Sequence, residues 1–339
     1  MEEIENLKPQ AERLAEIYAL SGRDDLVRYA ERILGCSTRL TYRHAPERDK
    51  PCSMALNVDE INWCRVRLCP PCSLAKSGKL RAKLFKVVPR IREALPTHQF
   101  VFLTLTCRND LVTNSRQTIG ILNDGWRRLS RRKNFPAVGA LRSIEVTMPY
   151  DVYYQGRFID RMGDKSFKVW CRQNNPNWNQ LEKRPTDECN WHLHCLLIVP
   201  QCYFSGHRYW NHDAWVDNWQ QSARLSYQPV VEVHKVTPRS KGQTLDEAIL
   251  EISKYTTKPD DLIQSPEWTI ELTDQIKGIK SYSVSGLFRQ FIRQNELDRL
   301  ESTGNLGDEQ KQDGAIVRFT WNYQTKSYNL VQLGSFYYN

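Results

Sequence analysis

The sequence of 339 residues contains no long hydrophobic run. Its longest apolar stretches are short, such as residues 195–199, whereas a membrane-spanning helix needs about 20 apolar residues. The first ten residues, MEEIENLKPQ, are acidic and polar and do not resemble a secretory signal. The sequence therefore predicts a cytoplasmic protein without a membrane partner.

Internal repeats and low-complexity tracts are also absent. Hydrophobic residues make up 40% of the 339 positions, enough to bury a substantial core in one large domain or two smaller ones. The ten cysteines of a protein in a reducing compartment are expected to be metal ligands or buried thiols rather than disulfides.

Acidic residues are missing from the stretch between Arg65 and Arg92, which is rich in lysine and arginine, and a second basic cluster covers residues 127–133. A charge run is usually a solvated helix face, but two such clusters and a net charge of +9 favour a polyanionic partner, normally nucleic acid. The residues expected to contact DNA are Lys76, Lys79, Arg81, Lys83, Arg127, Arg128, Arg131 and Arg132.

Hydrophobic periodicity predicts strands and helices without strict alternation, which favours an α+β core with an antiparallel sheet. Residues 36–73 are expected to be irregular, and residues 149–190 to form a long insertion with weak strands. The predicted strands cover residues 100–106, 141–148, 191–199 and 230–236, with a terminal hairpin over 317–333. The predicted helices cover residues 9–34 (broken at Ser21-Gly22), 74–95 (interrupted near Pro89), 115–133, 213–225, 244–257 and 284–297, and a further helix begins at Ser265-Pro266.

Two histidines, His192 and His194, lie two positions apart at the start of an apolar run. Because side chains alternate along a strand, both imidazoles point to the same face of a sheet. Two imidazoles side by side can share one divalent metal ion. The alternative is a pair of surface histidines on an edge strand.

A predicted helix carries Glu251 and Tyr255 four positions apart and therefore on one face, with Lys254 and Lys258 on an adjacent face. A tyrosine is a poor nucleophile while protonated, since its pKa is ≈ 10. Attack on a phosphate needs a metal, a base or a cation nearby, and these neighbours supply several of those parts. The same spacing also fits an ordinary amphipathic helix.

Three cysteines follow the pattern Cys64-x4-Cys69-Pro-Pro-Cys72, which places thiolates on a tight turn as in zinc knuckles. A fourth ligand is needed, and Cys36 and Cys52 are the upstream candidates. A structural zinc at this point would hold the basic helix that begins near Leu74 against DNA. The alternative is a set of buried free thiols. Ligand spacing is not seen for Cys107, Cys171, Cys189, Cys195 and Cys202.

Four segments, in this order, resemble the rolling-circle plasmid replication initiators, whose catalytic core is the HUH endonuclease fold. The first is FLTLT at residues 102–106, and the second is a Glu-x-Thr pattern within residues 142–147. The third is His192-Leu193-His194, and the fourth is Glu-x-x-Lys-Tyr-x-x-Lys at residues 251–258. Residues 280–288 also resemble the segment that follows the tyrosine helix in this family, so the resemblance covers about residues 36–290.

The resemblance implies two metal sites. His192, His194 and Glu145 would bind a catalytic Mn²⁺ or Mg²⁺ ion, and Asp151 and Asp187 are the alternatives to Glu145. The family often has a further histidine before this pair, whereas Asn190 and Trp191 stand here. Cys36 matches the upstream cysteine of the family, which implies structural zinc ligands Cys36, Cys64, Cys69 and Cys72, with Cys52 still open as the fourth.

The resemblance also implies a reaction. Tyr255 would attack one strand of DNA, forming a 5′-phosphotyrosine link and a free 3′-OH that primes a polymerase. Glu251 would act as a base for water or a second strand at termination, and Lys254 and Lys258 would contact phosphate or help to ionise the tyrosine.

The expected protein is thus a plasmid rolling-circle replication initiator of the bacterial cytoplasm, which nicks one strand at the origin and rejoins strands at termination. Its partners would be double-stranded and single-stranded plasmid origin DNA, with a host helicase and polymerase. The alternatives are an HUH transposase or relaxase, or a non-catalytic zinc-containing regulator that binds the origin. The tyrosine follows the histidines here, an order that favours the replication or transposase branch.

Four parts are expected along the chain. They are a helical segment at 1–35, a zinc-binding module with a basic helix at 36–97, an antiparallel HUH endonuclease domain flanked by helices at 98–297, and a linker with a β-hairpin at 298–339.

Overall fold

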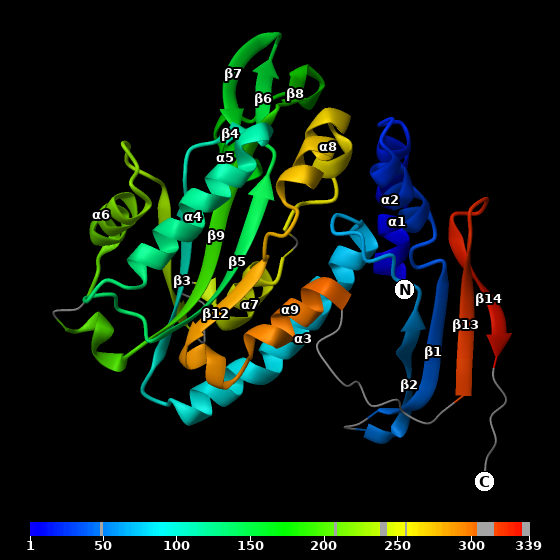
Figure 1. Cartoon of the computed structure of the whole chain (residues 1–339), viewed down its shortest axis with the longest axis horizontal. Coiled ribbons are helices and arrows are strands. Elements are labelled where there is room, and N and C mark those ends of the chain that lie inside the picture. The colour runs from blue at the N-terminus through cyan, green and yellow to red at the C-terminus, as the bar shows by residue number, and fades with distance from the viewer. Residues whose placement is uncertain (48–49, 207–208, 238–242, 255, 304–314, 334–339) are drawn as a thin grey trace. The chain divides into compact units, whose positions relative to one another are not determined.

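The computed structural model describes residues 1–339 except 48–49, 207–208, 238–242, 255, 304–314 and 334–339, and it describes no side chains within 44–59. The chain forms two compact units (Figure 1). The first combines Met1–Lys76 with Thr303–Asn339, and the second is Ser77–Ser302. The mixture of helices and mainly antiparallel sheets confirms the predicted α+β class, whereas the division into four parts stays a prediction.

In the first unit, helices α1 (Glu2–Ala19) and α2 (Asp24–Leu34) form an antiparallel pair joined at the predicted break. Gly22 supplies the turn with a φ of +69°, a conformation that other residues rarely adopt. Apolar residues at helical spacing, including Leu14 and Leu26, are fully buried.

The sheet of the first unit has the strand order β14-β13-β1-β2. The strands are β1 (Arg39–Glu47), β2 (Lys50–Ile61), β13 (Ala315–Asn322) and β14 (Ser327–Leu333). The terminal hairpin is confirmed, whereas the expectation of irregular structure over residues 36–73 is wrong. Residues 39–47 and 50–61 form strands because β1 pairs with β13 from the far end of the chain, a partner that local sequence does not show. Leu40, Tyr42, Ile61 and Val317 form the small core of this sheet.

The main sheet of the second unit has the order β11-β10-β3-β9-β5-β12, and all neighbours are antiparallel except β10 and β11. Its strands are β3 (Gln99–Thr106), β5 (Gly139–Thr147), β9 (Glu188–Val199), β10 (Val231–Thr237), β11 (Gln243–Thr244) and β12 (Tyr282–Gly286), and β4 (Asp110–Leu111) adds a short pairing with β9. The histidine strand β9 lies between β3 and β5, so the alternative of a pair of surface histidines on an edge strand is wrong.

Helices cover both faces of this sheet. Trp191 donates from Nε1 to Ser115 Oγ at the start of α4 (3.0 Å), so α4 lies on the face of odd-numbered β9 residues, in front of the strands in Figure 1. His194 points to the opposite face, where α7 contributes Glu251. The helices of the second unit are α3 (Pro70–Ala94, which begins in the first unit), α4 (Ser115–Leu129), α5 (Asp164–Asn174), α6 (His212–Ala223), α7 (Leu245–Ile252), α8 (Pro266–Gln275) and α9 (Gln294–Thr303). Short 3-10 turns cover Val112–Asn114, Trp178–Gln180, Gln201–Phe204, Asp261–Ile263 and Leu287–Gln290.

The insertion predicted at residues 149–190 forms a three-stranded sheet of order β7-β6-β8 with helix α5 between its strands in sequence. Its strands are β6 (Tyr150–Tyr154), β7 (Arg157–Met162) and β8 (Leu181–Pro185). β6 follows β5 directly, and β8 leads into β9. The insertion therefore rises from the ends of the two strands that carry the predicted metal ligands.

Helix α7 begins as predicted, with a reciprocal capping box between Thr244 and Glu247. It ends at Ile252, however, and not near Thr257. Ser253 donates from Oγ to the carbonyl of Ile249 at 2.7 Å, which competes with continuation of the helix. The next residues pair with β5, since Val146 N donates to Thr256 O at 2.8 Å.

The helix predicted at residues 284–297 is also wrong in its first half. Residues Tyr282–Gly286 form β12 and pair with β5, and α9 begins only at Gln294. Gly286 has a φ of +55°, and a Cβ there would lie 2.1 Å from the carbonyl oxygen of Val138, so the chain approaches β5 more closely than a side chain allows. Pro89, by contrast, lies inside α3 without interrupting it.

Candidate metal centres

Glu145, His192 and His194 come together on two central strands. Glu145 of β5 is directly opposite His192 of β9, and His194 is two residues along on the same face. Glu145 Oε2 lies 2.9 Å from His194 Nε2 and 3.4 Å from His192 Nε2. One ligand atom from each of the three lies within 4.8 Å of the others, so this cluster could hold a metal ion.

The electrostatics of this cluster suit a metal. Burial alone would raise the pKa of Glu145, but its contacts with His192 and His194 outweigh burial and hold that pKa well below its usual range. Burial lowers the pKa of His194, which keeps its imidazole neutral. A carboxylate beside a neutral imidazole is the protonation state in which both bind a cation. Thr104 shares a 3.1 Å hydrogen bond with His194 Nδ1, which orients the ring toward Glu145.

Two of the predicted catalytic residues also reach this cluster. Glu251 Oε1, at the end of α7, lies 3.8 Å from His194 Nε2. The other carboxylate oxygen of Glu251 forms an ion pair with Lys254 Nζ at 2.5 Å. A second carboxylate and a cation therefore border the three-residue cluster.

Tyr255 itself lies outside the described residues, but the backbone on both sides of it is fixed. The hydroxyl of Tyr282 donates to Lys254 O at 3.2 Å. Beyond position 255, Thr256 O accepts from Val146 N, and Thr257 forms a parallel bridge with the same residue. Because Val146 follows Glu145, Thr256 and Thr257 lie along β5 next to the cluster.

Lys258 is held by the insertion. Its ammonium forms an ion pair with Asp164, the first residue of α5, and this pair outweighs burial and raises the pKa of Lys258. A buried carboxylate follows at Asp261, which accepts from Met148 N (3.1 Å) and from the hydroxyl of Tyr150 (2.9 Å). Lys258 and Asp261, which follow Tyr255 in the chain, are thus bonded to α5 and β6.

Asp151 and Asp187, the alternative third ligands, do not join the cluster found among the described residues. Asp151 instead pairs with Arg161 at 2.6 Å.

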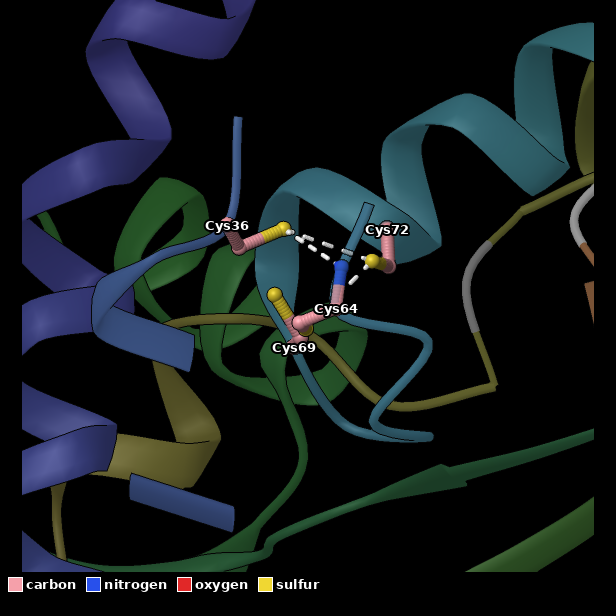
Figure 2. Close-up of side chains that lie close together, drawn as sticks. All are labelled: Cys36, Cys64, Cys69 and Cys72. Carbon is pink, nitrogen blue, oxygen red and sulfur yellow. Dashed lines mark hydrogen bonds between the residues drawn. The ribbon is translucent and has the colours of Figure 1, made fainter. Parts of the chain in front are cut away.

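Four cysteines form a second cluster, in the first unit. Figure 2 shows the thiols of Cys36, Cys64, Cys69 and Cys72 converging from the loop after α2, the loop after β2 and the first turn of α3. The sulfur of Cys72 lies 3.5 Å from that of Cys36 and 3.6 Å from that of Cys64, and all four lie within 4.8 Å of one another. Tetrahedral zinc with bonds of about 2.3 Å separates its sulfurs by about 3.8 Å, so this cluster could also hold a metal ion.

The four thiols differ in their tendency to ionise, and the hydrogen bond with Cys36 raises the pKa of Cys64. Hydrogen bonds from Cys36, Cys64 and Cys69 lower the pKa of Cys72, whereas burial raises that of Cys69. Backbone N–H groups point at sulfur as well: Cys64 N lies 3.4 Å from Cys36 Sγ. Cys52 lies in β2, within the range whose side chains the structure does not describe.

The other described cysteines lie outside both clusters. Burial raises the pKa of Cys107, Cys189 and Cys195 to about 12, as expected for core thiols. Cys202 is exposed and Cys171 is half-buried.

Several of the predicted DNA-contacting residues make internal contacts. Lys83 pairs with Glu296 at 3.1 Å, and Arg127 pairs with Asp124. Arg128 and Arg132 both bond to Ser222 of α6. Lys76, Lys79, Arg81 and Arg131 lie on α3 or just after α4. Which of the eight contact DNA stays a prediction.

Three residues of these sites were missed by sequence reasoning: Thr104, Asp164 and Lys8, the last of which donates to the carbonyl of Cys36 at 2.7 Å. Lys8 alone has a sequence signal, since it shares the apolar face of α1 with Ala11 and Ala15. Thr104 and Asp164 reach their partners only through tertiary pairing.

The fold and the clusters define an α+β protein with two candidate metal centres, one of sulfur ligands and one of nitrogen and oxygen ligands. Among the described residues, no helix is long and apolar enough to cross a membrane. The family model described as Replication protein (Rep_1) matches residues 55–329, so the chain belongs to that family of replication proteins.

Relatives in bacteria cover most of the chain. A Protein rep of Streptococcus pneumoniae serotype 2 is 27% identical over 329 residues, covering 93% of this chain and 88% of the relative. A Protein rep of Bacillus amyloliquefaciens is 25% identical and covers 91% and 86%. A Replication protein of Staphylococcus aureus is 28% identical and covers 72% and 95%. No solved structure matches.

Proposed function

We propose that this protein is a plasmid rolling-circle replication initiator that nicks one strand at the origin through a 5′-phosphotyrosine intermediate and rejoins strands at termination. The observation that carries the proposal is the pairing of residues 256–257, which follow Tyr255 in the chain, with Val146, the neighbour of Glu145. Membership of a replication protein family supports the biological role.

The catalytic metal is assigned to Glu145, His192 and His194. Three protein ligands leave positions open for water and a phosphate oxygen, and the nitrogen and oxygen donors suit Mn²⁺ or Mg²⁺. A cation held by these three residues would polarise the phosphoryl oxygen of the scissile phosphodiester. Thr104 keeps the ring of His194 oriented, and Glu145 stays ionised through its two histidine neighbours.

The phenol of Tyr255 gives up its proton and its oxygen forms a bond to phosphorus as the bond to the 3′ oxygen breaks. The 3′ oxygen takes up a proton, so the proton count balances. Because the phosphodiester is retained, the reverse reaction joins strands without ATP. Glu251 is placed to accept a proton from water or from a second strand at termination. Lys254 and Lys258 supply positive charge for the phosphate and for ionisation of the phenol.

The four cysteines are assigned a structural zinc, which closes the loops after α2 and β2 onto the first turn of α3. Origin DNA, double-stranded and single-stranded, is assigned to the basic residues of α3 and those at the end of α4. A host helicase and polymerase would follow at the 3′-OH, in the cytoplasm of a bacterium.

The test is incubation of the full chain with single-stranded origin oligonucleotides and Mn²⁺, followed by peptide mapping of any denaturant-resistant adduct. The adduct is expected on the peptide that contains Tyr255. Tyr255→Phe should bind the oligonucleotide but form no adduct, whereas the matched control Tyr209→Phe, at an exposed tyrosine of the same unit, should react normally.

Adduct formation by Tyr255→Phe would overturn the assignment of the nucleophile. Binding of origin DNA without cleavage by the unaltered chain, across divalent metals, would favour the non-catalytic regulator. Cleavage that requires a mobile-element end or a transfer origin would favour the transposase or relaxase.

A further inference from the structure

Lys8 is a buried lysine beside the four-cysteine cluster. Its side chain is 1% exposed and shares the apolar face of α1 with Ala11, Ala15 and Tyr18. Lysine is almost never fully buried without a partner, because removing an ammonium from water is costly. The structure must therefore compensate this charge.

The direct contacts of Lys8 do not carry a formal negative charge. Its Nζ donates to the carbonyl oxygen of Cys36 at 2.7 Å and lies 5.3 Å from the ring centroid of Trp321. Glu12, one helical turn away, pairs through Oε2 with Lys326 at 2.5 Å. Besides Glu12, the cysteine cluster, to which Cys36 belongs, is a source of negative charge close to Lys8.

Charge counting distinguishes the states of that cluster. Four protonated thiols carry no net charge and give a buried ammonium little to pair with. A divalent metal bound by four thiolates carries a net charge of about −2, and this negative charge would offset the cost of burying the ammonium of Lys8 beside Cys36. A buried dianion is itself costly, so the cluster and Lys8 stabilise each other.

We propose that Lys8 is the counter-charge of the metal-bound four-cysteine centre, and that its buried ammonium slows loss of the metal. This inference rests on the zinc assignment made above, but not on cleavage of DNA. Lys8 is a positioning residue here, because it touches the backbone of the ligand Cys36 and not the metal.

Its surroundings include the C-terminal hairpin. Trp321 of β13 lies against the ammonium, and its backbone N–H donates to Thr38 O at 2.8 Å. The hydroxyl of Tyr328 of β14 donates to Ser37 O at 2.5 Å. The hairpin and α1 thus hold the loop of Cys36 from two sides, with Lys8 between them.

The test measures zinc release from the zinc-loaded full chain to a chromogenic chelator while a maleimide alkylates the thiols. Lys8→Met should release zinc about tenfold faster than the unaltered chain, since a Coulombic stabilisation is lost. Arg13→Met is the matched control, because it removes one positive charge from an exposed position of α1 that pairs only with Glu16 in the described contacts. Its release rate should be unchanged, and a rate for Lys8→Met equal to that of the control overturns the proposal.

A second comparison separates charge from packing. Cys64→His replaces one thiolate by a neutral ligand in a set that zinc accepts, so the need for a counter-charge falls. The factor by which Lys8→Met accelerates zinc release should be smaller by about threefold or more in the Cys64→His background than in the unaltered chain. An equal acceleration in both backgrounds shows a packing role and overturns the proposal.

The same pair of backgrounds tests the proposal even if the Lys8→Met variant fails to fold. If Lys8→Met alone is insoluble, the proposal requires the double variant with Cys64→His to fold and retain zinc. If the double variant fails as well, the proposal is wrong. A chain that purifies without zinc overturns the zinc assignment together with Lys8, whereas nicking through Tyr255 is measured independently of both.

Discussion

The two candidate metal centres are built in opposite ways. The four cysteines lie on loops and the first turn of a helix, and the sulfurs surround one point (Figure 2). Glu145, His192 and His194 lie on adjacent central strands, where the register of β5 and β9 fixes their spacing. Four sulfur ligands close a metal off, whereas three ligands leave it open to a substrate.

This difference indicates which of the two sites keeps its geometry when its metal is lost. Strand register is fixed by the buried residues Leu193 and Cys195–Val199, so the histidine site is present without its metal. The cysteines are not spaced by a strand register, so metal binding contributes directly to the folding of their loops. We therefore expect loss of the catalytic metal to affect the reaction and loss of zinc to affect stability.

The largest expected effect is on cleavage when both histidines are replaced. His192→Ala with His194→Ala should lower the cleavage rate about a thousandfold or more, because several kcal/mol of transition-state stabilisation are lost. Binding of origin DNA, measured by fluorescence anisotropy, should remain. The matched control is His234→Ala, at an exposed position of β10. Full cleavage in excess EDTA would contradict a metal mechanism.

Cys72→Ser should disrupt the four-cysteine centre. Losing one of four ligands should release zinc and lower the free energy of unfolding by about 3 kcal/mol or more. Zinc content and thermal denaturation of the full chain measure this change. Cys202→Ser, at an exposed thiol, should be neutral. Retained zinc and unchanged stability in Cys72→Ser would rule out a structural zinc at this cluster.

Glu251→Gln should separate two steps of one reaction. The first adduct should form within about fivefold of the normal rate, while its resolution should slow about a hundredfold, as for loss of a general base. Single-turnover and multiple-turnover assays distinguish the two. Asp246→Asn, an exposed acid on the same helix, is the control. Equal slowing of both steps would assign Glu251 to the metal site instead.

Asp164→Asn should give the smallest effect. Asp164 holds Lys258 by an ion pair in which both side chains are 38% exposed, and such pairs are worth at most about 1 kcal/mol. The cleavage rate should fall about fivefold or less, and Asp164→Glu should restore part of it. A loss as large as that of the histidine variants would place Asp164 among the metal ligands.

Sequence patterns predicted the members of both clusters better than their scaffolds. Alternation placed His192 and His194 on one face, but the partner across from His192 depends on pairing over an insertion that local patterns do not resolve. The same limit explains β12, where Val284 and Phe288 suggest a helix but pairing with β5 overrides that propensity.

Local sequence patterns predicted the first residue of helix α7 better than its last residue. The capping box at Thr244 is formed by neighbouring residues and was correct. After the end of α7, where Ser253 bonds back to Ile249, the chain pairs with Val146 of β5, which the local sequence does not show. The sequence did not predict Lys8 as a site residue for a related reason. Its burial next to Cys36 arises from the packing of α1 on a loop and on β13.

The pairing of β1 with β13 has a consequence for biosynthesis. At about 5–20 residues per second, the roughly 270 residues between the two strands take on the order of ten to fifty seconds to make. During that interval the edge of β1 lacks the partner that it has in the finished protein. An open strand edge is a template for other chains, so the pace of the ribosome sets how long each nascent molecule is exposed to its neighbours.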